Sequence, residues 1–286
     1  KRSFGTMAIR ASLSSILARN ALGSNAIFAF TFPGVLARSG NARALQRAFL
    51  STQPVDLKDS NEALAREALK NADAVCFDVD STVIREEGID VLADFCGAGE
   101  QVAELTRKAM GGSMLFQDAI KARLDLIQPS RQDITNCLDK HPPPLSAGVK
   151  EFIKILHERG TDVYLVSGGF RLMIQPVADL VGVPHSRIYA NTILFNENGT
   201  YRDFDTTEPT SHSGGKAEVI KLLQDKHGYK NVIMVGDGVT DMQARPPAAA
   251  FIGYGGVAER EAVMEGADWF VRDFADLIAA VREEGA

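Results

Sequence analysis

Short apolar runs alternate with helical patterns along the chain from about residue 60. Four runs have the length and β-branched content of buried strands, at residues 74–77, 163–166, 232–235 and 249–252. This alternation predicts an α/β fold with a mainly parallel sheet. The first three runs end in the polar or glycine-rich turns DVDST, SGGF and GDGVTD. Because ligands bind outside the carboxyl ends of parallel strands, we expect the three turns to form one site.

Residues 86–145 interrupt the alternation with helical patterns alone. A helical insertion directly after the first strand would lie above the carboxyl edge of the sheet, where it can cover a site. His141 and three prolines mark the return of the chain. We predict a core of residues 60–85 and 146–286 with a helical cap domain of residues 86–145. The helical stripes are Ile89, Leu92, Phe95, Val102, Leu105 and Ala109, and then Phe116, Ile120, Arg123 and Ile127.

The first 55 residues differ in composition from the rest. They hold seven Lys and Arg and no acid, and they are rich in Ser and Ala, as organelle transit peptides are. We expect a disordered transit segment and a location in the chloroplast stroma or mitochondrial matrix; a tail without an address is the alternative. The apolar residues 26–37 include Pro33 and Gly34 and are too few to span a bilayer. Because the chain begins with Lys1, it is a fragment or starts at Met7.

Charge and cysteine content exclude several classes of function. Of the 31 Lys and Arg, 24 lie after residue 55, against all 37 Asp and Glu. Such an acidic body does not suit nucleic acid, which is bound by positive surfaces. No membrane span is found, and composition leaves a homodimer open. The three cysteines form no CxxC pattern, so we expect reduced thiols and no zinc site.

Carboxylates gather at the ends of two predicted strands. Asp78 and Asp80 follow the first strand, and Asp237 and Asp241 follow the third. One such pair is often only turn chemistry. Two pairs at the same edge indicate a concentration of negative charge that needs a cation, and oxygen ligands with water and phosphate suit Mg²⁺.

Two glycine-rich stretches offer groups for an anion. Ser167-Gly168-Gly169 follows a strand and opens a helix, which suits phosphate, although a plain helix cap has the same letters. Ser213-Gly214-Gly215-Lys216 brings a lysine near the same edge, with a solvated surface lysine as the alternative. It is not a P-loop, because residue 210 is Thr and residue 217 is Ala.

In order and spacing, these stretches resemble the four motifs of the haloacid dehalogenase superfamily of phosphatases. The match is closer still to the branch that hydrolyses phosphoserine, through DVDSTVIREEGIDVLADFCGAG, AMGGSMLF, VSGGFR and SGGKAEVI, and it covers roughly residues 60–281. The resemblance implies a three-layer, Rossmann-like α/β core with a small helical cap. It also implies Mg²⁺-dependent hydrolysis of O-phospho-L-serine through an aspartyl-phosphate, the last step of serine biosynthesis.

The resemblance also implies a role for each matched residue. Asp78 would be the nucleophile, and Asp80 the general acid and then the general base. Mg²⁺ would be bound by Asp78, the Asp80 backbone carbonyl and Asp237, with support from Asp241. The groups implied for the phosphoryl oxygens are Ser167, Gly168, Gly169 and Lys216.

Substrate recognition is expected in the helical insertion. By resemblance, Glu87 would bind the ammonium group and Arg123 the carboxylate. Arg123 also shares the inward face of a helical stripe with Phe116 and Ile120. An ion pair of Arg123 with Asp118 or Asp125 is the alternative. The remaining substrate contacts implied by the family are Met110, Gly111, Phe116, Thr240 and Arg260.

One position departs from the family pattern, and two other functions stay open. Many relatives read GDGxND, whereas this chain has Thr240 before Asp241; the eukaryotic branch is similar to it there. The same chemistry on another small phosphomonoester, or phosphoryl transfer to a second alcohol, is one alternative. An inactive binding protein on the same scaffold is the other, and retention of Asp78, Asp80 and the other motif residues argues against it.

Overall fold

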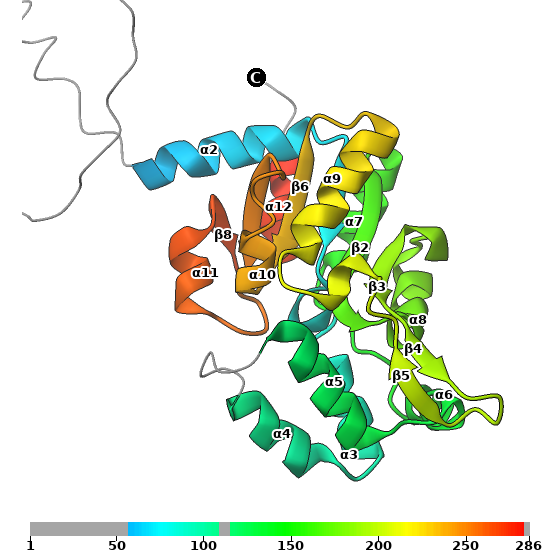
Figure 1. Cartoon of the computed structure of the whole chain (residues 1–286). Coiled ribbons are helices and arrows are strands. Elements are labelled where there is room, and N and C mark those ends of the chain that lie inside the picture. Colours follow the sequence, from blue (N-terminus) through cyan, green and yellow to red (C-terminus); the bar gives the residue numbers. More distant parts are fainter. Residues whose placement is uncertain (1–56, 109–114, 283–286) are drawn as a thin grey trace, which may run out of the picture. The chain divides into compact units, whose positions relative to one another are not determined.

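A parallel sheet of six strands forms the centre of the molecule. The computed structural model describes residues 57–108 and 115–282 (Figure 1). The strand order is β3-β2-β1-β6-β7-β8, and every neighbouring pair is parallel. The strands are β1 (Ala74–Phe77), β2 (Asp162–Phe170), β3 (Ile188–Asn191), β6 (Val232–Gly236), β7 (Ala250–Tyr254) and β8 (Trp269–Val271).

Helices cover both faces of this sheet. Val75 and Phe77 of β1 point to one face and Ala74 and Cys76 to the other, as the alternation of a strand requires. The first face packs against α2 (Leu57–Lys70), α7 (Val149–Glu158), α8 (Arg171–Val181) and α12 (Phe274–Arg282), and the second against α9 (Gly215–His227) and α11 (Glu261–Gly266). The predicted three-layer α/β fold is therefore confirmed.

Within the described ranges, four α-helices follow β1 before the chain reaches α7. They are α3 (Gly88–Phe95), α4 (Gly99–Lys108), α5 (Phe116–Ile127) and α6 (Arg131–Lys140), called here the helical insertion, and they lie below the sheet in Figure 1. Their apolar sides form a separate core that includes Phe170 and Met173. The predicted helical stripe that begins at Ile89 falls on two helices, because the chain breaks at Gly97, whose φ is +76°.

The two segments that join the insertion to the sheet run side by side. Ile84 and Leu145 form an antiparallel bridge. The Arg85 amide donates to the Pro144 carbonyl at 2.9 Å, and the Ser146 amide donates to the Val83 carbonyl at 2.9 Å. The chain therefore leaves and re-enters the core at one point.

The four predicted apolar runs are all strands of the sheet, namely β1, β2, β6 and β7, but two further strands were not predicted. β3 and β8 were missed; they have four and three residues, and β3 ends in a polar side chain. β2 does not end at Val166 but continues irregularly through the SGG turn to Phe170. A separate antiparallel hairpin follows β3 and consists of β4 (Ile193–Phe195) and β5 (Tyr201–Phe204).

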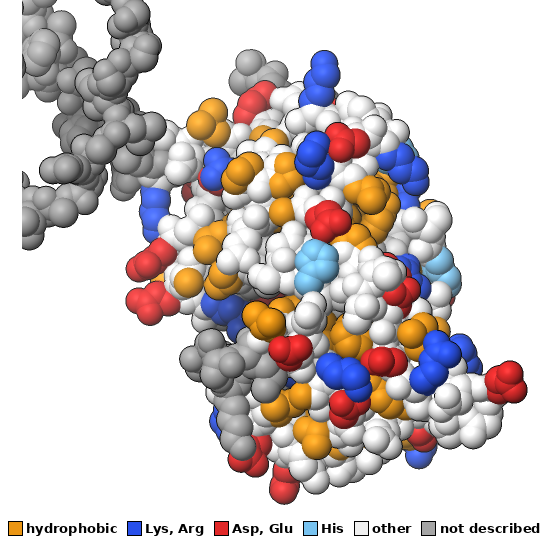
Figure 2. All heavy atoms as spheres, viewed as in Figure 1, with side chains coloured by type: hydrophobic (Ala, Val, Ile, Leu, Met, Phe, Trp, Pro, Cys, Tyr) orange, Lys and Arg blue, Asp and Glu red, His pale blue; other side chains and the backbone are white. Residues whose placement is uncertain are grey.

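Short elements complete the described chain. They are the turn η1 (Val79–Val83), the single-turn helices η3 (His185–Arg187) and η4 (Pro209–Ser211), and α10 (Val239–Met242). No helix of the described ranges is long and apolar enough to cross a membrane. Side chains of both charges are scattered over the face seen in Figure 2. The expectations for residues 1–55 lie outside the described residues.

Candidate active site

The three predicted turns meet at the carboxyl edge of the sheet. They line a cavity of about 190 Å³ that also reaches into the helical insertion. Of the residues expected at the site, only Met110 and Gly111 lie outside the described chain, and Asp241 contacts the cavity-lining Lys216. The others all line the cavity: Asp78, Asp80, Glu87, Phe116, Arg123, Ser167, Gly168, Gly169, Lys216, Asp237, Thr240 and Arg260.

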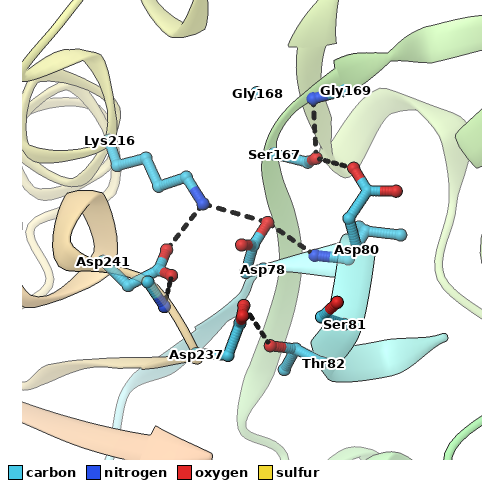
Figure 3. A network of polar contacts seen from close by, with 12 residues as sticks. Asp78, Asp80, Ser81, Thr82, Ser167, Gly168, Gly169, Lys216, Asp237 and Asp241 are labelled. Atoms are coloured by element: carbon cyan, nitrogen blue, oxygen red, sulfur yellow. Dashed lines mark hydrogen bonds and ion pairs between the residues drawn. The ribbon is translucent and has the colours of Figure 1, made fainter. Parts of the chain in front are cut away.

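Asp78 lies at the end of β1, in the middle of the sheet. Its amide donates to the Val235 carbonyl of β6 at 2.9 Å, so the neighbouring strand fixes its backbone. Its Oδ1 accepts a hydrogen bond from the Val79 amide at 2.7 Å and lies 2.9 Å from Lys216 Nζ. Figure 3 shows the carboxylate between Lys216 and the turn. Both donors contact Oδ1, so Oδ2 is the oxygen left toward the cavity.

The turn after Asp78 aims the second carboxylate. Ser81 adopts a left-handed φ of +54°, and its hydroxyl donates to Glu87 Oε1 at 2.7 Å. Asp80 Oδ1 accepts from the Gly88 amide at 2.7 Å, and Asp80 Oδ2 from the Ser167 hydroxyl at 3.4 Å. The Asp80 carboxyl is therefore held from the insertion on one side and from β2 on the other.

Asp80 differs from an ordinary carboxyl in its protonation. Burial, together with the negative charges of Glu87 and Asp78, raises the pKa of Asp80 to about 7. The Gly88 amide and Lys216 oppose this rise without cancelling it. A carboxyl with a pKa near neutrality can both release and accept a proton at physiological pH.

Three carboxylates form a candidate metal centre. Oxygens of Asp78, Asp237 and Asp241 lie within 4.8 Å of one another. Lys216 Nζ is 2.6 Å from Asp241 Oδ1, and Arg260 contacts Asp237 Oδ2 at 2.9 and 3.0 Å. Figure 3 shows the three carboxylates facing one another. The donors are all oxygens, which fits a hard cation such as Mg²⁺.

The charge balance of this centre also fits a cation. Burial and the neighbouring Asp78 raise the pKa of Asp237 and of Asp241. Burial lowers the pKa of Lys216, but Asp241 and Asp78 outweigh this and raise it. The lysine is therefore protonated. Asp80, Asp237 and Asp241 still resist ionisation, because the two positive charges of Lys216 and Arg260 are fewer than the carboxylates around them. A divalent ion would supply the missing positive charge.

The three carboxylates are not equivalent as ligands. Asp241 Oδ1 contacts Lys216, and its Oδ2 accepts from the Gly238 amide at 2.9 Å. Both oxygens are therefore engaged within the protein. Both oxygens of Asp237 are engaged as well, Oδ1 by Thr82 and Oδ2 by Arg260. Asp78 and Asp237 nevertheless line the cavity, so they fit direct ligation better than Asp241 does.

The Ser167-Gly168-Gly169 stretch leaves no room for larger side chains. A Cβ on Gly169 would lie 2.7 Å from Asp80 Oδ2, and one on Gly168 would lie 3.0 Å from the Phe116 ring. The Ser167 hydroxyl is fully buried and accepts from the Gly169 amide at 2.9 Å. Glycine here lets the backbone approach both the carboxyl and the cavity.

The cavity is also lined by one cationic and one acidic side chain from the helical insertion and the turn before it, Arg123 and Glu87. Arg123 lines it from α5, and its Nε is buried without a hydrogen-bond partner. Asp125, a partner considered from the sequence, pairs instead with Lys121. Burial raises the pKa of Glu87, which lies 4.0 Å from Arg260. The cavity therefore offers an unsatisfied cationic donor and an anionic acceptor beyond the acidic cluster.

Several residues at the site were not identified from the sequence. Thr82 donates to Asp237 Oδ1 at 3.3 Å, and Thr210 and His212 line the cavity. Asn191 ends β3 at the same sheet edge and contacts Gly168. A polar residue at the end of a strand was the available signal for Asn191, but β3 itself had not been predicted.

Comparison with known proteins supplies the family. The model of the haloacid dehalogenase-like hydrolases matches residues 72–247. A phosphoserine phosphatase of Bos taurus is 52% identical over 213 residues, which cover 74% of this chain and 95% of that protein. A chloroplastic phosphoserine phosphatase of Arabidopsis thaliana is 46% identical over 254 residues, which cover 86% of each chain.

A solved structure supports the same grouping. The crystal structure of a phosphoserine phosphohydrolase-like protein from Francisella tularensis has a TM-score of 0.64 and 29% identity, and the match covers 73% of this chain and 99% of that one. The matches in sequence and in fold therefore agree. The chain therefore belongs to the haloacid dehalogenase-like hydrolases, as an enzyme of the phosphatase family to which these relatives belong.

Proposed function

We propose that this enzyme hydrolyses O-phospho-L-serine to L-serine and phosphate, with Mg²⁺ as its cofactor. The observation that carries the substrate is the cavity, in which Arg123 and Glu87 lie beyond the acidic cluster. Phosphoserine has a phosphate, a carboxylate and an ammonium group, and these match Lys216 with the SGG stretch, Arg123 and Glu87. The reaction would be the last step of serine biosynthesis, and the phosphoserine phosphatases among the relatives support this assignment.

The first half of the proposed reaction forms an aspartyl-phosphate. Asp78 Oδ2 attacks the phosphorus, and the bond between phosphorus and the serine oxygen breaks with its electron pair on that oxygen. Asp80, with its pKa near 7, donates the proton to the leaving oxygen. Ser167, the Gly168 amide and Lys216 stabilise the phosphoryl oxygens in the transition state.

The second half releases phosphate. Asp80, now ionised, accepts a proton from water, which attacks the phosphorus and breaks its bond to Asp78. Asp78 and Asp237, with the backbone carbonyl of Asp80, would hold the cation. When bound, Mg²⁺ neutralises the charge of nucleophile and substrate and orients the phosphoryl group. Asp241 keeps Lys216 in place between the two halves of the site.

Substrate panels with single variants test the assignment. Arg123→Ala should lower kcat/KM for phosphoserine by about 10- to 100-fold, the range for a charge-assisted hydrogen bond. O-phosphoethanolamine lacks only the carboxylate, so its turnover should change little. Arg202→Ala, on the exposed side of β5, is the matched control. If the wild type released phosphate no faster from phosphoserine than from generic monoesters, the substrate assignment would be wrong.

Metal dependence is tested separately. Chelation should abolish phosphate release, and Mg²⁺ should restore it. Mg²⁺ without substrate should also raise the Tm, because binding to the folded state stabilises it and relieves repulsion within the cluster. Asp237→Asn should weaken this shift. A full rate in the presence of excess chelator would contradict the cofactor assignment.

We also propose two features of organisation. Residues 86–145 act as a cap domain on a core of residues 60–85 and 146–286; the helical insertion and the paired crossing segments support this division. Residues 1–55 act as a transit peptide, with the chloroplastic relative and their acid-free composition in support. Import assays with isolated chloroplasts and mitochondria test the transit peptide. If neither organelle took up the chain and cleaved it, the transit-peptide proposal would be contradicted.

A further inference from the structure

Asn191 is a buried polar side chain in direct contact with the phosphate-binding stretch. It ends β3 and is fully inaccessible to solvent. Its Nδ2 donates to the Gly168 carbonyl at 2.8 Å, and its Oδ1 accepts from the Thr210 hydroxyl at 3.0 Å. Thr210, which is 3% exposed, also lines the cavity.

The contact replaces backbone pairing that the sheet lacks at this point. β2 pairs with β3 regularly at Leu165 and Val166, and the register then shifts before Phe170 pairs with Asn191. Residues 167–169 therefore stand outside the ladder between these strands. An amide side chain that binds the Gly168 carbonyl fixes the orientation of this peptide, whose N–H, that of Gly169, donates to the Ser167 hydroxyl at 2.9 Å and so holds that hydroxyl at the cavity.

Thr210 connects the same contact to Lys216. It belongs to η4, and a Cβ placed on Gly215 would lie 1.7 Å from the Pro209 carbonyl oxygen and 3.1 Å from the Thr210 Cα. The turn of η4 therefore packs directly on the first residue of α9, next to Lys216. The path from Gly168 through Asn191 and Thr210 joins the two elements that offer donors to the phosphoryl group.

We propose that Asn191 and Thr210 are positioning residues that set the distance between the Ser167–Gly169 backbone and Lys216. Neither residue touches the reacting atoms; they hold the two groups of donors so that both reach one phosphoryl group. The inference rests on the proposed function, because it needs a phosphoryl group at this site. A displacement of about 1 Å in catalytic groups can lower the rate by on the order of 100-fold.

A second group of contacts holds the segment before η4 independently of Asn191 and Thr210. Arg171 Nη2 lies 2.9 Å from Glu208 Oε1, and the Thr192 hydroxyl donates to the same oxygen at 2.8 Å. This group links the start of α8 and the end of β3 to the segment that enters η4. The segment therefore stays in place when Asn191 and Thr210 lose their hydrogen bond, and the effect falls on fine positioning.

Isosteric variants separate positioning from stability. Thr210→Val removes the hydroxyl and keeps the shape, Thr210→Ser restores the hydroxyl, and Asn191→Asp places an oxygen against the Gly168 carbonyl. Thr161→Val is the matched control, because the Thr161 hydroxyl is also buried, donates to the Ala72 carbonyl at 3.2 Å and lies at the other end of β2. For each protein we would measure kcat, KM, the Kd for inorganic phosphate and the Tm.

Thr210→Val should lower kcat by about tenfold and weaken phosphate binding severalfold, as expected for lost orientation of donors. Asn191→Asp should lose more, and Thr210→Ser should stay within a factor of about two of the wild type. Thr161→Val should lower the Tm alone. The proposal is overturned if Thr210→Val behaves like Thr161→Val, or if Thr210→Ser loses as much kcat as Thr210→Val.

The substrate of the enzyme and the positioning role of Asn191 and Thr210 are tested by different measurements. A wild type that hydrolyses p-nitrophenyl phosphate but shows no preference for phosphoserine removes the proposed substrate, and the variants are then compared on the first ester. A wild type that prefers phosphoserine while Thr210→Val equals it removes only the positioning role. A wild type that binds no phosphate removes both.

Discussion

Asp78 and Asp80 are two residues apart and have different surroundings. Asp78 contacts a lysine and a backbone amide at the end of β1. Asp80 is turned by the left-handed Ser81 into a buried place beside Glu87, and burial raises its pKa to about 7. The first is suited to attack and the second to proton transfer, because one faces cations and the other faces acids.

Asp78→Asn tests the nucleophile. The amide oxygen can still accept from the Val79 amide, so the fold of the turn should be kept. We expect kcat to fall by at least about 10³-fold, because an amide does not form the acyl-phosphate. Asp203→Asn, a partly exposed change on β5, is the control. Full activity of Asp78→Asn with a normal Tm would rule out the covalent mechanism.

Residue types were predictable from the sequence where a motif has fixed spacing, and contacts were not. The carboxylates, Ser167 and Lys216 follow strands that could be recognised from their apolar runs. Thr82 and Asn191 were missed, because their roles depend on which side chain lies opposite across the sheet. The alternative ion pair of Arg123 with Asp125 was also a question of packing, and Asp125 pairs instead with Lys121.

The start of α9 is closely packed against η4. Gly215 begins the helix against the carbonyl oxygen of Pro209, and Lys216 follows at once. Gly214 before it has a left-handed φ of +83°. The position of the lysine is therefore set by backbone packing as well as by its two ion pairs.

Gly215→Ala tests this packing. The added methyl group cannot fit 1.7 Å from a backbone oxygen, so the first turn of α9 must shift and carry Lys216 with it. We expect a loss of about 1–3 kcal/mol in the free energy of unfolding, together with a fall in kcat. Gly228→Ala, at the other end of α9, meets no atom within 4 Å and has a φ of +76°. It should cost about 1 kcal/mol and leave kcat unchanged. Equal kcat values for the two variants would contradict the packing argument.

Strands were predictable where the apolar run is free of polar residues: β1 and β3 both have four residues, but only β3 ends in a polar side chain. The strands at the centre of the sheet were recognised, whereas β3 and β8 at its edges were not. Such short strands are stabilised by their neighbours rather than by their own residues, so the local pattern is weak. The division between α3 and α4 was missed for a similar reason: Gly97 interrupts a stripe whose apolar spacing continues across it.

On the scale of the whole molecule, the sheet, its covering helices and the helical insertion belong to one unit, residues 54–286. α2 is part of it: Ala65 and Leu69 are buried, and Asn231 Nδ2 donates to the Ala68 carbonyl at 2.7 Å. The convergence of three turns at one edge was predictable from the rule for parallel sheets. The depth of the cavity and the charge balance within it were not, because they depend on packing.

Truncation tests the limits of this unit. A chain that begins at Pro54 should keep the Tm and the kcat of the full chain, because the contacts of α2 are retained. A chain that begins at Asn71 loses α2 and should be destabilised by at least about 3 kcal/mol, from the burial of Leu69 and its neighbours alone. Circular dichroism melts compare the three proteins. A large drop in Tm on removal of residues 1–53 alone would contradict the assignment of the unit.

The paired crossing segments have a consequence for how such enzymes diversify. Val83 and Ser146 are hydrogen-bonded neighbours, so the whole helical insertion is joined to the core at one crossing point. A shorter or longer insertion could replace the present one at this crossing point, because the distance between the two ends that it must join would stay almost the same. The insertion, which contacts the organic part of a phosphate ester, can therefore change in evolution while the residues that bind the phosphoryl group remain at the edge of the sheet.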